Sequence, residues 1–181
     1  SGLDWLLLDY ESHGMLKHCA RSLNHFYLEN PVLWENDFSW EGFSWIAHDD
    51  YTQSVICFRR IDHRGNELIA ACNFTPVQRE NYRIGVPVHG TYSEVFSTDA
   101  AEFGGTGTLN GTLDSERKEM HGFDQSLALT LPPLSVIYLR LVKAKPARRS
   151  SMVRAKKPAA SGAAAAKTGK KAGAKKTGKK E

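Results

Sequence analysis

The chain has 181 residues and a formal net charge of +4, a sum that conceals two oppositely charged regions. Residues 1–142 contain 10 Lys and Arg against 19 Asp and Glu, a net charge of −9. Residues 143–181 contain 14 Lys and Arg against one acid, Glu181, a net charge of +13. The length allows one ordinary domain with extensions, here an acidic body that carries a basic tail.

Several classes of protein are excluded by what the sequence lacks. The three cysteines, Cys19, Cys57 and Cys72, are odd in number and show no C-x-x-C spacing, which excludes a disulfide framework and a cysteine zinc site. We expect buried, reduced thiols in a cytoplasmic protein. The histidines are scattered without the spacing of a metal site, so we expect neither metal nor cofactor. No apolar run approaches the length of a membrane span, so we expect no membrane partner.

Residues 13–30 predict the first element, an amphipathic helix. Its apolar residues recur at three- and four-residue steps and define one stripe: Met15, Leu16, Cys19, Leu23, Phe26 and Tyr27. Ser12 is a suitable N-cap, and Pro31 ends the helix because the residue before a proline avoids the helical region. One helix cannot form a core alone, so the stripe requires a partner surface.

Residues 31–50 form a crossing segment that is rich in aromatic residues. All four tryptophans lie within the first 45 residues of the chain: Trp5, Trp34, Trp40 and Trp45. We expect them to pack the junction between the helix and a sheet, and the alternative is that one or two stack on sugar rings. The adjacent carboxylates Asp49 and Asp50 point to opposite faces of an extended segment, so they do not form an acid/base pair.

Residues 54–77 predict a β-hairpin, because two short apolar runs flank a polar turn that contains Gly65. A turn centred on Arg64 and Gly65 would place Cys57 directly opposite Cys72 within one sheet. A lone hairpin is marginal in water, so the chain beyond it must supply more strands.

Further extended runs follow, separated by glycine- and proline-containing turns, at residues 82–88, 92–97, 126–131 and 134–141. Residues 46–142 therefore predict about five to seven short strands, a pattern typical of an antiparallel sandwich in a mostly β protein. The Gly/Thr/Asn-rich loop at residues 100–115 is no phosphate-binding loop, because no lysine follows its glycines in that pattern. From Lys143 onward Ala, Lys, Gly, Pro, Ser and Thr dominate the composition, and residues 143–181 are predicted to be a disordered tail.

Nine short motifs occur along the chain in the following order: LDW (3–5), SLNHFY (22–27), P-LW--DF (31–38), GF-W (42–45), RGNE (64–67), NFTPV (73–77), YR-GVP (82–87), STDA--FGG (97–105) and LPPLS-IYL (131–139). The ordered set closely resembles the C-terminal part of the bacterial 1,4-α-glucan (glycogen) branching enzymes of the α-amylase superfamily. The resemblance covers residues 1 to about 142.

The resemblance implies a catalytic (β/α)8 barrel followed by an antiparallel sandwich of the α-amylase type. Residues 1–31 would be the end of the barrel, with the predicted helix as its last outer helix, and residues 32–45 would connect it to the sandwich at residues 46–142. The barrel would supply the partner that the apolar stripe lacks. The tail at residues 143–181 departs from the family's plan.

The family transfers α-1,4-glucan segments to α-1,6 linkage by a retaining mechanism that uses carboxylates on the barrel strands. A barrel needs about 250 residues, so no catalytic residue is assigned here and the piece is expected to be inactive alone. Asp4 and Trp5 match the family near the rim of the barrel, and they are the candidate contacts for an α-glucan such as glycogen or amylose.

Two alternatives stay open at this point. The chain could be a stand-alone carbohydrate-binding or scaffold module, although the apolar stripe would then be exposed and would invite aggregation. The tail at residues 143–181 could bind polyanions such as nucleic acid weakly by counterion release, or could act only as a solubilising extension.

Overall fold

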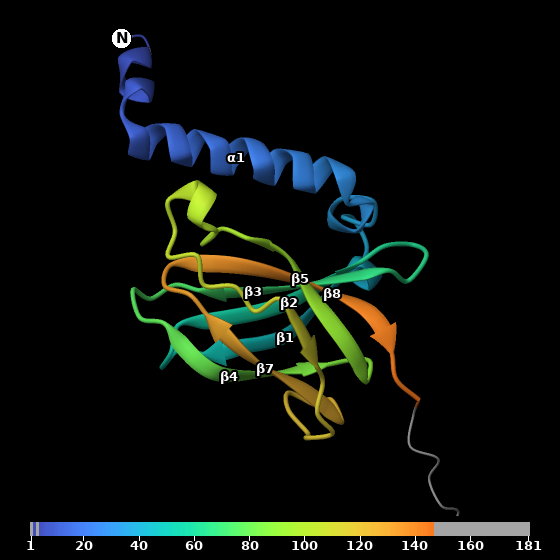
Figure 1. Cartoon of the computed structure of the whole chain (residues 1–181). Coiled ribbons are helices and arrows are strands. Elements are labelled where there is room, and N and C mark those ends of the chain that lie inside the picture. The colour runs from blue at the N-terminus through green and yellow to red at the C-terminus, as the bar shows by residue number, and fades with distance from the viewer. Residues whose placement is uncertain (1, 3, 147–181) are drawn as a thin grey trace, which may run out of the picture. The chain divides into compact units, whose positions relative to one another are not determined.

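The computed structural model describes residue 2 and residues 4–146, in which a long helix precedes an antiparallel β-sandwich (Figure 1). One sheet has six strands in the order β1-β2-β3-β8-β5-β6, and the other pairs β4 with β7. The predicted mostly β sandwich is confirmed. The predicted disorder of the tail falls, from residue 147 onward, outside the described residues.

The helical segments among the described residues are η1 (Trp5–Asp9), α1 (Glu11–Glu29), η2 (Pro31–Leu33), η3 (Trp40–Gly42) and η4 (Ala101–Phe103), of which α1 alone is an α-helix. The strands are β1 (Phe43–Asp50), β2 (Val55–Ile61), β3 (Glu67–Asn73), β4 (Arg79–Val86), β5 (Gly90–Ser97), β6 (Thr112–Asp114), β7 (Gln125–Leu131) and β8 (Ser135–Ala144).

The core lies between the two sheets. Its least exposed side chains are mostly aliphatic and come from both sheets, and they include Ile69, Ile84, Leu127, Ile137 and Leu139, each 0% exposed. Alternate residues of each strand point into this core, as expected for a strand with one buried face. The opposite face of the six-stranded sheet is the outer face, and α1 contacts it.

The β2–β3 hairpin forms as predicted, but its register differs by one residue. The turn closes with hydrogen bonds from Asp62 N to Asn66 O (3.0 Å) and from Gly65 N to Asp62 O (3.1 Å), and Gly65 has a φ of +80°. This five-residue loop is centred on Arg64, so the strands pair one position away from the predicted register.

The predicted opposition of Cys57 and Cys72 is therefore wrong. Cys57 pairs with Ala71 and points into the core, whereas Cys72 pairs with Ile56 and lies on the outer face. Both thiols are free and buried, and burial raises the pKa of each. Neither is a reactive nucleophile.

Three element boundaries differ from the sequence prediction. The α1 helix begins at Glu11, so Ser12 lies inside its first turn and is not the cap. Strand β1 begins at Phe43, inside the segment predicted to be a connection. Strand β8 continues to Ala144, past the predicted start of the tail, and Lys145 beyond it donates from its backbone to the His89 carbonyl at 2.8 Å.

The described residues contain no helix that is both long enough and apolar enough to cross a membrane. They also bring together no group of three or more His, Cys, Asp and Glu side chains suited to a metal ion.

Candidate functional site

Helix α1 packs on the outer face of the six-stranded sheet through aromatic residues (Figure 1). The Phe26 ring lies 5.0 Å from the Phe96 ring of β5 and 5.2 Å from the Tyr138 ring of β8. At the C-terminal end of the helix, the buried Asn30 accepts a hydrogen bond from Arg140 of β8. These contacts attach the second half of α1 to the two adjacent strands.

The first half of α1 is attached to η4. His18 Nε2 lies 3.2 Å from Glu102 Oε2, and the His18 ring meets the Phe103 ring edge-on at 5.3 Å. Gly104 follows with a φ of +83°, and a Cβ atom there would approach the Met15 sulfur to 2.9 Å. The glycine thus permits both the left-handed backbone and the close approach of the helix. Together the two attachments hold α1 along its length.

The sheet covers only part of the predicted apolar stripe. At about 100° per residue, Met15, Cys19 and Phe26 fall on the flank that faces the sheet, while Leu16 and Tyr27 fall on the adjacent flank. Leu16 is 67% exposed and Tyr27 is 43% exposed. No residue of α1 is buried. The helix therefore presents an apolar flank at Leu16 and Tyr27 that the described residues leave exposed, and Leu23 beside them is partly buried.

The two sequence-predicted glucan contacts lie at the start of η1, where Asp4 is the N-cap and Trp5 the first residue. The Asp4 carboxylate accepts a hydrogen bond from Leu6 N at 3.1 Å and so caps η1. The Trp5 side chain is 68% exposed. The structure thus gives Asp4 a local structural role and leaves the Trp5 ring accessible, and their contact with glucan stays a prediction.

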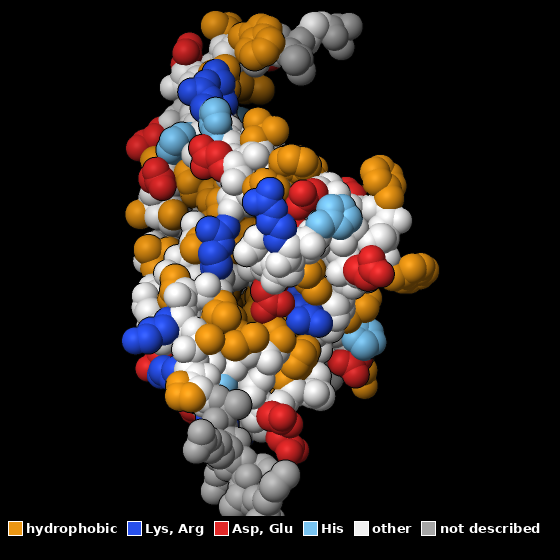
Figure 2. All heavy atoms as spheres, turned by 90° about the vertical axis from the view of Figure 1, so that its right-hand side faces the viewer, with side chains coloured by type: hydrophobic (Ala, Val, Ile, Leu, Met, Phe, Trp, Pro, Cys, Tyr) orange, Lys and Arg blue, Asp and Glu red, His pale blue; other side chains and the backbone are white. Residues whose placement is uncertain are grey.

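The tryptophans do not fill the helix–sheet junction, contrary to the expectation. Trp5, Trp40 and Trp45 are each about half exposed or more, and Trp34 meets α1 at the helix end, where its Nε1 donates to the Tyr27 carbonyl at 3.0 Å. The junction is filled instead by Phe26 and the buried Val32. Figure 2 shows hydrophobic side chains projecting between charged ones on this side of the molecule.

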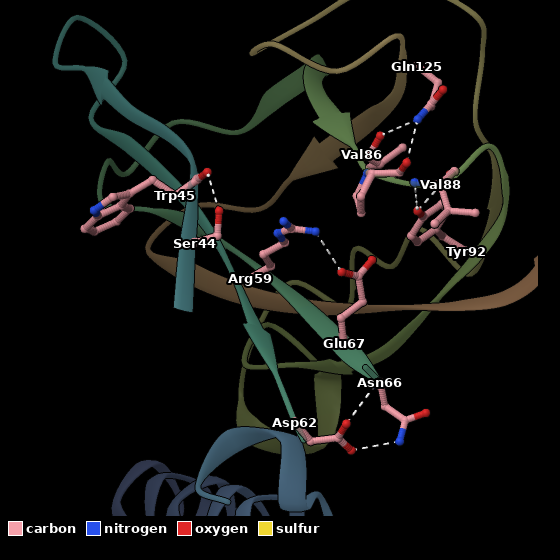
Figure 3. A network of polar contacts seen from close by, with 11 residues as sticks. Ser44, Trp45, Arg59, Asp62, Asn66, Glu67, Val86, Val88, Tyr92 and Gln125 are labelled. Carbon is pink, nitrogen blue, oxygen red and sulfur yellow. Dashed lines mark hydrogen bonds and ion pairs between the residues drawn. The ribbon is translucent and has the colours of Figure 1, made fainter. Parts of the chain in front are cut away.

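A polar cleft of about 550 Å³ opens where the β2–β3 hairpin separates from β8. Pairing between β3 and β8 ends at Ile69 and Leu139, so the hairpin tip and the end of β8 diverge. Inside, Arg59 Nη1 lies 3.1 Å from Glu67 Oε2 (Figure 3). Burial raises the pKa of the Glu67 carboxyl, and the positive charge of Arg59 opposes that shift. The pair is partly buried and mutually neutralised, which is typical of a structural ion pair.

The residues of the sandwich match a known protein family. The family described as "Alpha amylase, C-terminal all-beta domain" matches residues 45–142, which is more than half of the chain. The chain belongs to this family. The match begins in β1 and ends in β8, so it contains every strand of both sheets.

Curated relatives extend the similarity beyond the sandwich. The chain is 47% identical over 142 residues to the 1,4-alpha-glucan branching enzyme GlgB of Aquifex aeolicus, which is 77% of this chain and 22% of the relative. It is 45% identical over 141 residues to the enzyme of that name from Halothermothrix orenii, with the same coverage, and 45% identical over 140 residues to that of Prochlorococcus marinus strain NATL1A (76% and 18%). The chain spans about a fifth of the length of these relatives.

The resemblance that the sequence motifs indicated is thereby confirmed. The aligned lengths exceed the distance from residue 45 to the end of the chain, so the similarity includes residues before the sandwich. The similarity to the branching-enzyme relatives therefore begins before residue 45, where the matched alpha-amylase family domain begins.

Proposed function

We propose that this chain is the C-terminal part of a 1,4-alpha-glucan branching enzyme and that it braces the catalytic barrel of that enzyme. The observation that carries the proposal is the division of α1. One flank is fixed to the sandwich by Phe26 and His18, and the adjacent apolar flank at Leu16 and Tyr27 is exposed. A helix fixed on one side and exposed on the next can join a sandwich to a second apolar body.

The proposed organisation is the one that the resemblance implies, with its boundaries moved to the observed strands. Residues 1–31 are the end of the barrel, the connection from residue 32 ends where β1 begins at Phe43, the sandwich domain ends with β8 at Ala144, and the tail follows. The barrel is then the principal partner of this chain, and α-glucan is the substrate of the whole enzyme. The free thiols support a cytoplasmic location.

The reaction itself would belong to carboxylates of the barrel, which act as nucleophile and acid/base in a retaining mechanism. Asp50, a sandwich carboxylate that accepts several hydrogen bonds, is held in its charged form. Burial opposes the charge of Asp50, but hydrogen bonds from Tyr82, Thr52 and Gln53 outweigh it and lower the Asp50 pKa. A carboxylate held in its charged form is a poor proton donor. This chain is expected to be inactive alone because a catalytic barrel needs about 250 residues.

The test compares this chain with a polypeptide that carries the gene's upstream sequence. Branching is measured as the shift of the iodine–amylose absorption spectrum. We expect the longer polypeptide to shift the spectrum and the 181-residue chain to leave it unchanged. Activity of the 181-residue chain alone would contradict the assignment of the chemistry to the barrel, and an inactive longer polypeptide would contradict the proposed function.

A stand-alone carbohydrate-binding or scaffold module is the second candidate. The exposed flank of α1 counts against it, because large uncovered apolar surfaces promote association. A start codon directly upstream of Ser1 in the gene would favour this second candidate.

A separate role is proposed for the tail. Residues 143–181 carry a net charge of +13, which supports weak, salt-dependent binding of a polyanion such as nucleic acid. The competing role is a solubilising extension that binds nothing.

A further inference from the structure

A second exposed surface lies in the segment that enters the sandwich, and it adjoins α1 where Trp34 donates to the Tyr27 carbonyl. Residues 34–45 read WENDFSWEGFSW, with five aromatic residues and no aliphatic or basic residue. We call the five together the aromatic surface: Trp34, Phe38, Trp40, Phe43 and Trp45. Phe38 and Trp40 are fully exposed or nearly so, at 105% and 97%. Exposed apolar side chains that gather in one patch mark interaction sites.

Trp45 is mounted rigidly on β1. The Phe43 ring meets the Trp45 ring edge-on at 4.9 Å, and the Phe58 ring of β2 does so at 6.1 Å. Phe43 and Phe58 stack on each other at 5.4 Å. Figure 3 shows the Trp45 indole projecting away from the sheet, and the side chain stays 49% exposed. The indole orientation is therefore fixed before any ligand binds.

Hydrogen-bonding groups lie between the rings. The Asp37 side chain is 45% exposed and is held in place by an ion pair with Arg60 of β2, whose cross-strand partner is Phe43. Ser39 donates to Asn36, and this bond fixes the turn between Phe38 and Trp40. Held carboxylates and hydroxyls of this kind can accept from, or donate to, the hydroxyl groups of a ligand.

The two exposed surfaces differ in chemistry, so each suits a different class of partner. The flank of α1 is largely aliphatic, which suits the apolar surface of a protein. The aromatic surface combines rings with carboxylates and hydroxyls, which suits a neutral ligand with apolar C–H faces and many hydroxyl groups. The three acids Glu35, Asp37 and Glu41 exclude a polyanion. We propose that the aromatic surface binds an α-glucan chain by stacking sugar rings on Trp40 and Trp45. The inference rests on the proposed function for the identity of the sugar.

The experiment uses the full 181-residue chain. Binding is measured by co-sedimentation with glycogen and by calorimetric titration with maltoheptaose. We expect the double variant Trp40→Ala, Trp45→Ala to raise the dissociation constant about tenfold or more, because two stacked rings are removed. The variant Trp45→Phe keeps a smaller ring and should fall between the two. The matched control is Tyr51→Ala, which removes an 87% exposed aromatic side chain outside the surface and should bind like the unaltered chain.

Circular dichroism of each variant checks that the sandwich is retained. Unaltered affinity in the folded double variant would overturn the site, and so would an equal loss in Tyr51→Ala. Failure of the glucan site and failure of the proposed function give different results. If the longer polypeptide branches amylose but the unaltered chain does not bind glucan, the site is wrong and the function stands. If the chain binds glucan through these rings but the longer polypeptide does not branch, the site stands and the function is wrong.

Discussion

At the scale of single residues, Asp50 organises the junction between β1 and β2. Its two carboxylate oxygens accept hydrogen bonds from Thr52, Gln53 and the Tyr82 hydroxyl, the last at 2.8 Å. Tyr82 belongs to β4, so this bond links the two sheets at the end of the sandwich. The sequence shows Asp50 only as a surface carboxylate near a turn, because Tyr82 is 32 positions away along the chain.

The first prediction concerns the pH dependence of that link. Removal of the Tyr82 hydroxyl by Tyr82→Phe should lower the free energy of unfolding by about 1 kcal/mol at pH 7. The hydroxyl favours charged Asp50 and lowers its folded-state pKa below the ordinary value of 3.8. The stabilisation is therefore full above that ordinary value and is lost as the pH falls through the folded-state pKa.

Urea unfolding of both proteins at pH 7 and near pH 3 measures the difference. In the variant Asp50→Asn, adding Tyr82→Phe should have the same small effect at both pH values. A Tyr82→Phe cost that stays constant with pH in the Asp50 background would show that the hydroxyl acts through something other than this carboxylate.

The second prediction concerns the turn of the β2–β3 hairpin. Gly65 has a φ of +80°, and no atom lies within 4 Å of a Cβ built there, so a side chain meets only backbone strain. Gly65→Ala should therefore lower the free energy of unfolding by about 1 kcal/mol. Gly65→Asn should cost less, because Asn tolerates the left-handed region. Equal costs for the two substitutions in urea titrations would contradict backbone strain as the cause.

At the scale of elements, the sequence predicts which strands exist better than how they are placed. Alternation and turn residues identify β2, β3, β5, β7 and β8 in roughly their observed ranges. Strand β1 is obscured because two irregularities, after Trp45 and after Ala47, break its alternation. Strand β6 has three residues, too few to carry a pattern. The one-residue register error in the hairpin arises because the sequence does not specify the length of the turn loop.

The same limit applies to α1 and to the candidate sites. The helical period identifies the apolar stripe, but only the positions of Phe96, Tyr138 and η4 divide it into a covered flank and an exposed flank. The rings of the aromatic surface are visible in the sequence. The exposure of these rings is not visible in the sequence, because it depends on which side chains occupy the helix–sheet junction. In the structure Phe26 and Val32 occupy it.

The third prediction tests the exposed flank of α1. Leu16→Asp places a charge on that flank, and the matched control Asn24→Asp places the same residue on the exposed far side of the helix. In the 181-residue chain, both should change the free energy of unfolding by no more than about 0.5 kcal/mol. In the longer polypeptide, only Leu16→Asp should lower the melting temperature and the branching rate, because it places a charge against the barrel.

Differential scanning calorimetry and the iodine–amylose assay supply the two measurements. If Asn24→Asp weakens the longer polypeptide as much as Leu16→Asp does, the flank carries no specific contact. If neither substitution affects it, the barrel does not rest on this side of α1.

At the scale of the whole molecule, charge is divided along the chain rather than mixed. The body is acidic, and the transition to the basic tail is anchored to the sandwich, since Lys145 Nζ lies 2.7 Å from Asp114 Oδ2. This ion pair and the strand contact at Ala144 fix the point at which the tail leaves β6 and β8. The Asp114 carboxylate thus partly neutralises Lys145. Most of the positive charge that could contact a polyanion lies in residues 147–181.

The last prediction follows from that division. A chain ending at residue 146 should unfold at the same temperature as the full chain, because it keeps every strand and the Lys145–Asp114 ion pair. The full chain should bind duplex DNA weakly, with a logarithmic salt slope of about −0.9 for each phosphate that it neutralises, and the shortened chain should not bind. Fluorescence anisotropy at several salt concentrations measures the slope. Equal binding by both chains would place the contact on the body, and no binding by the full chain would leave the tail as a solubilising extension.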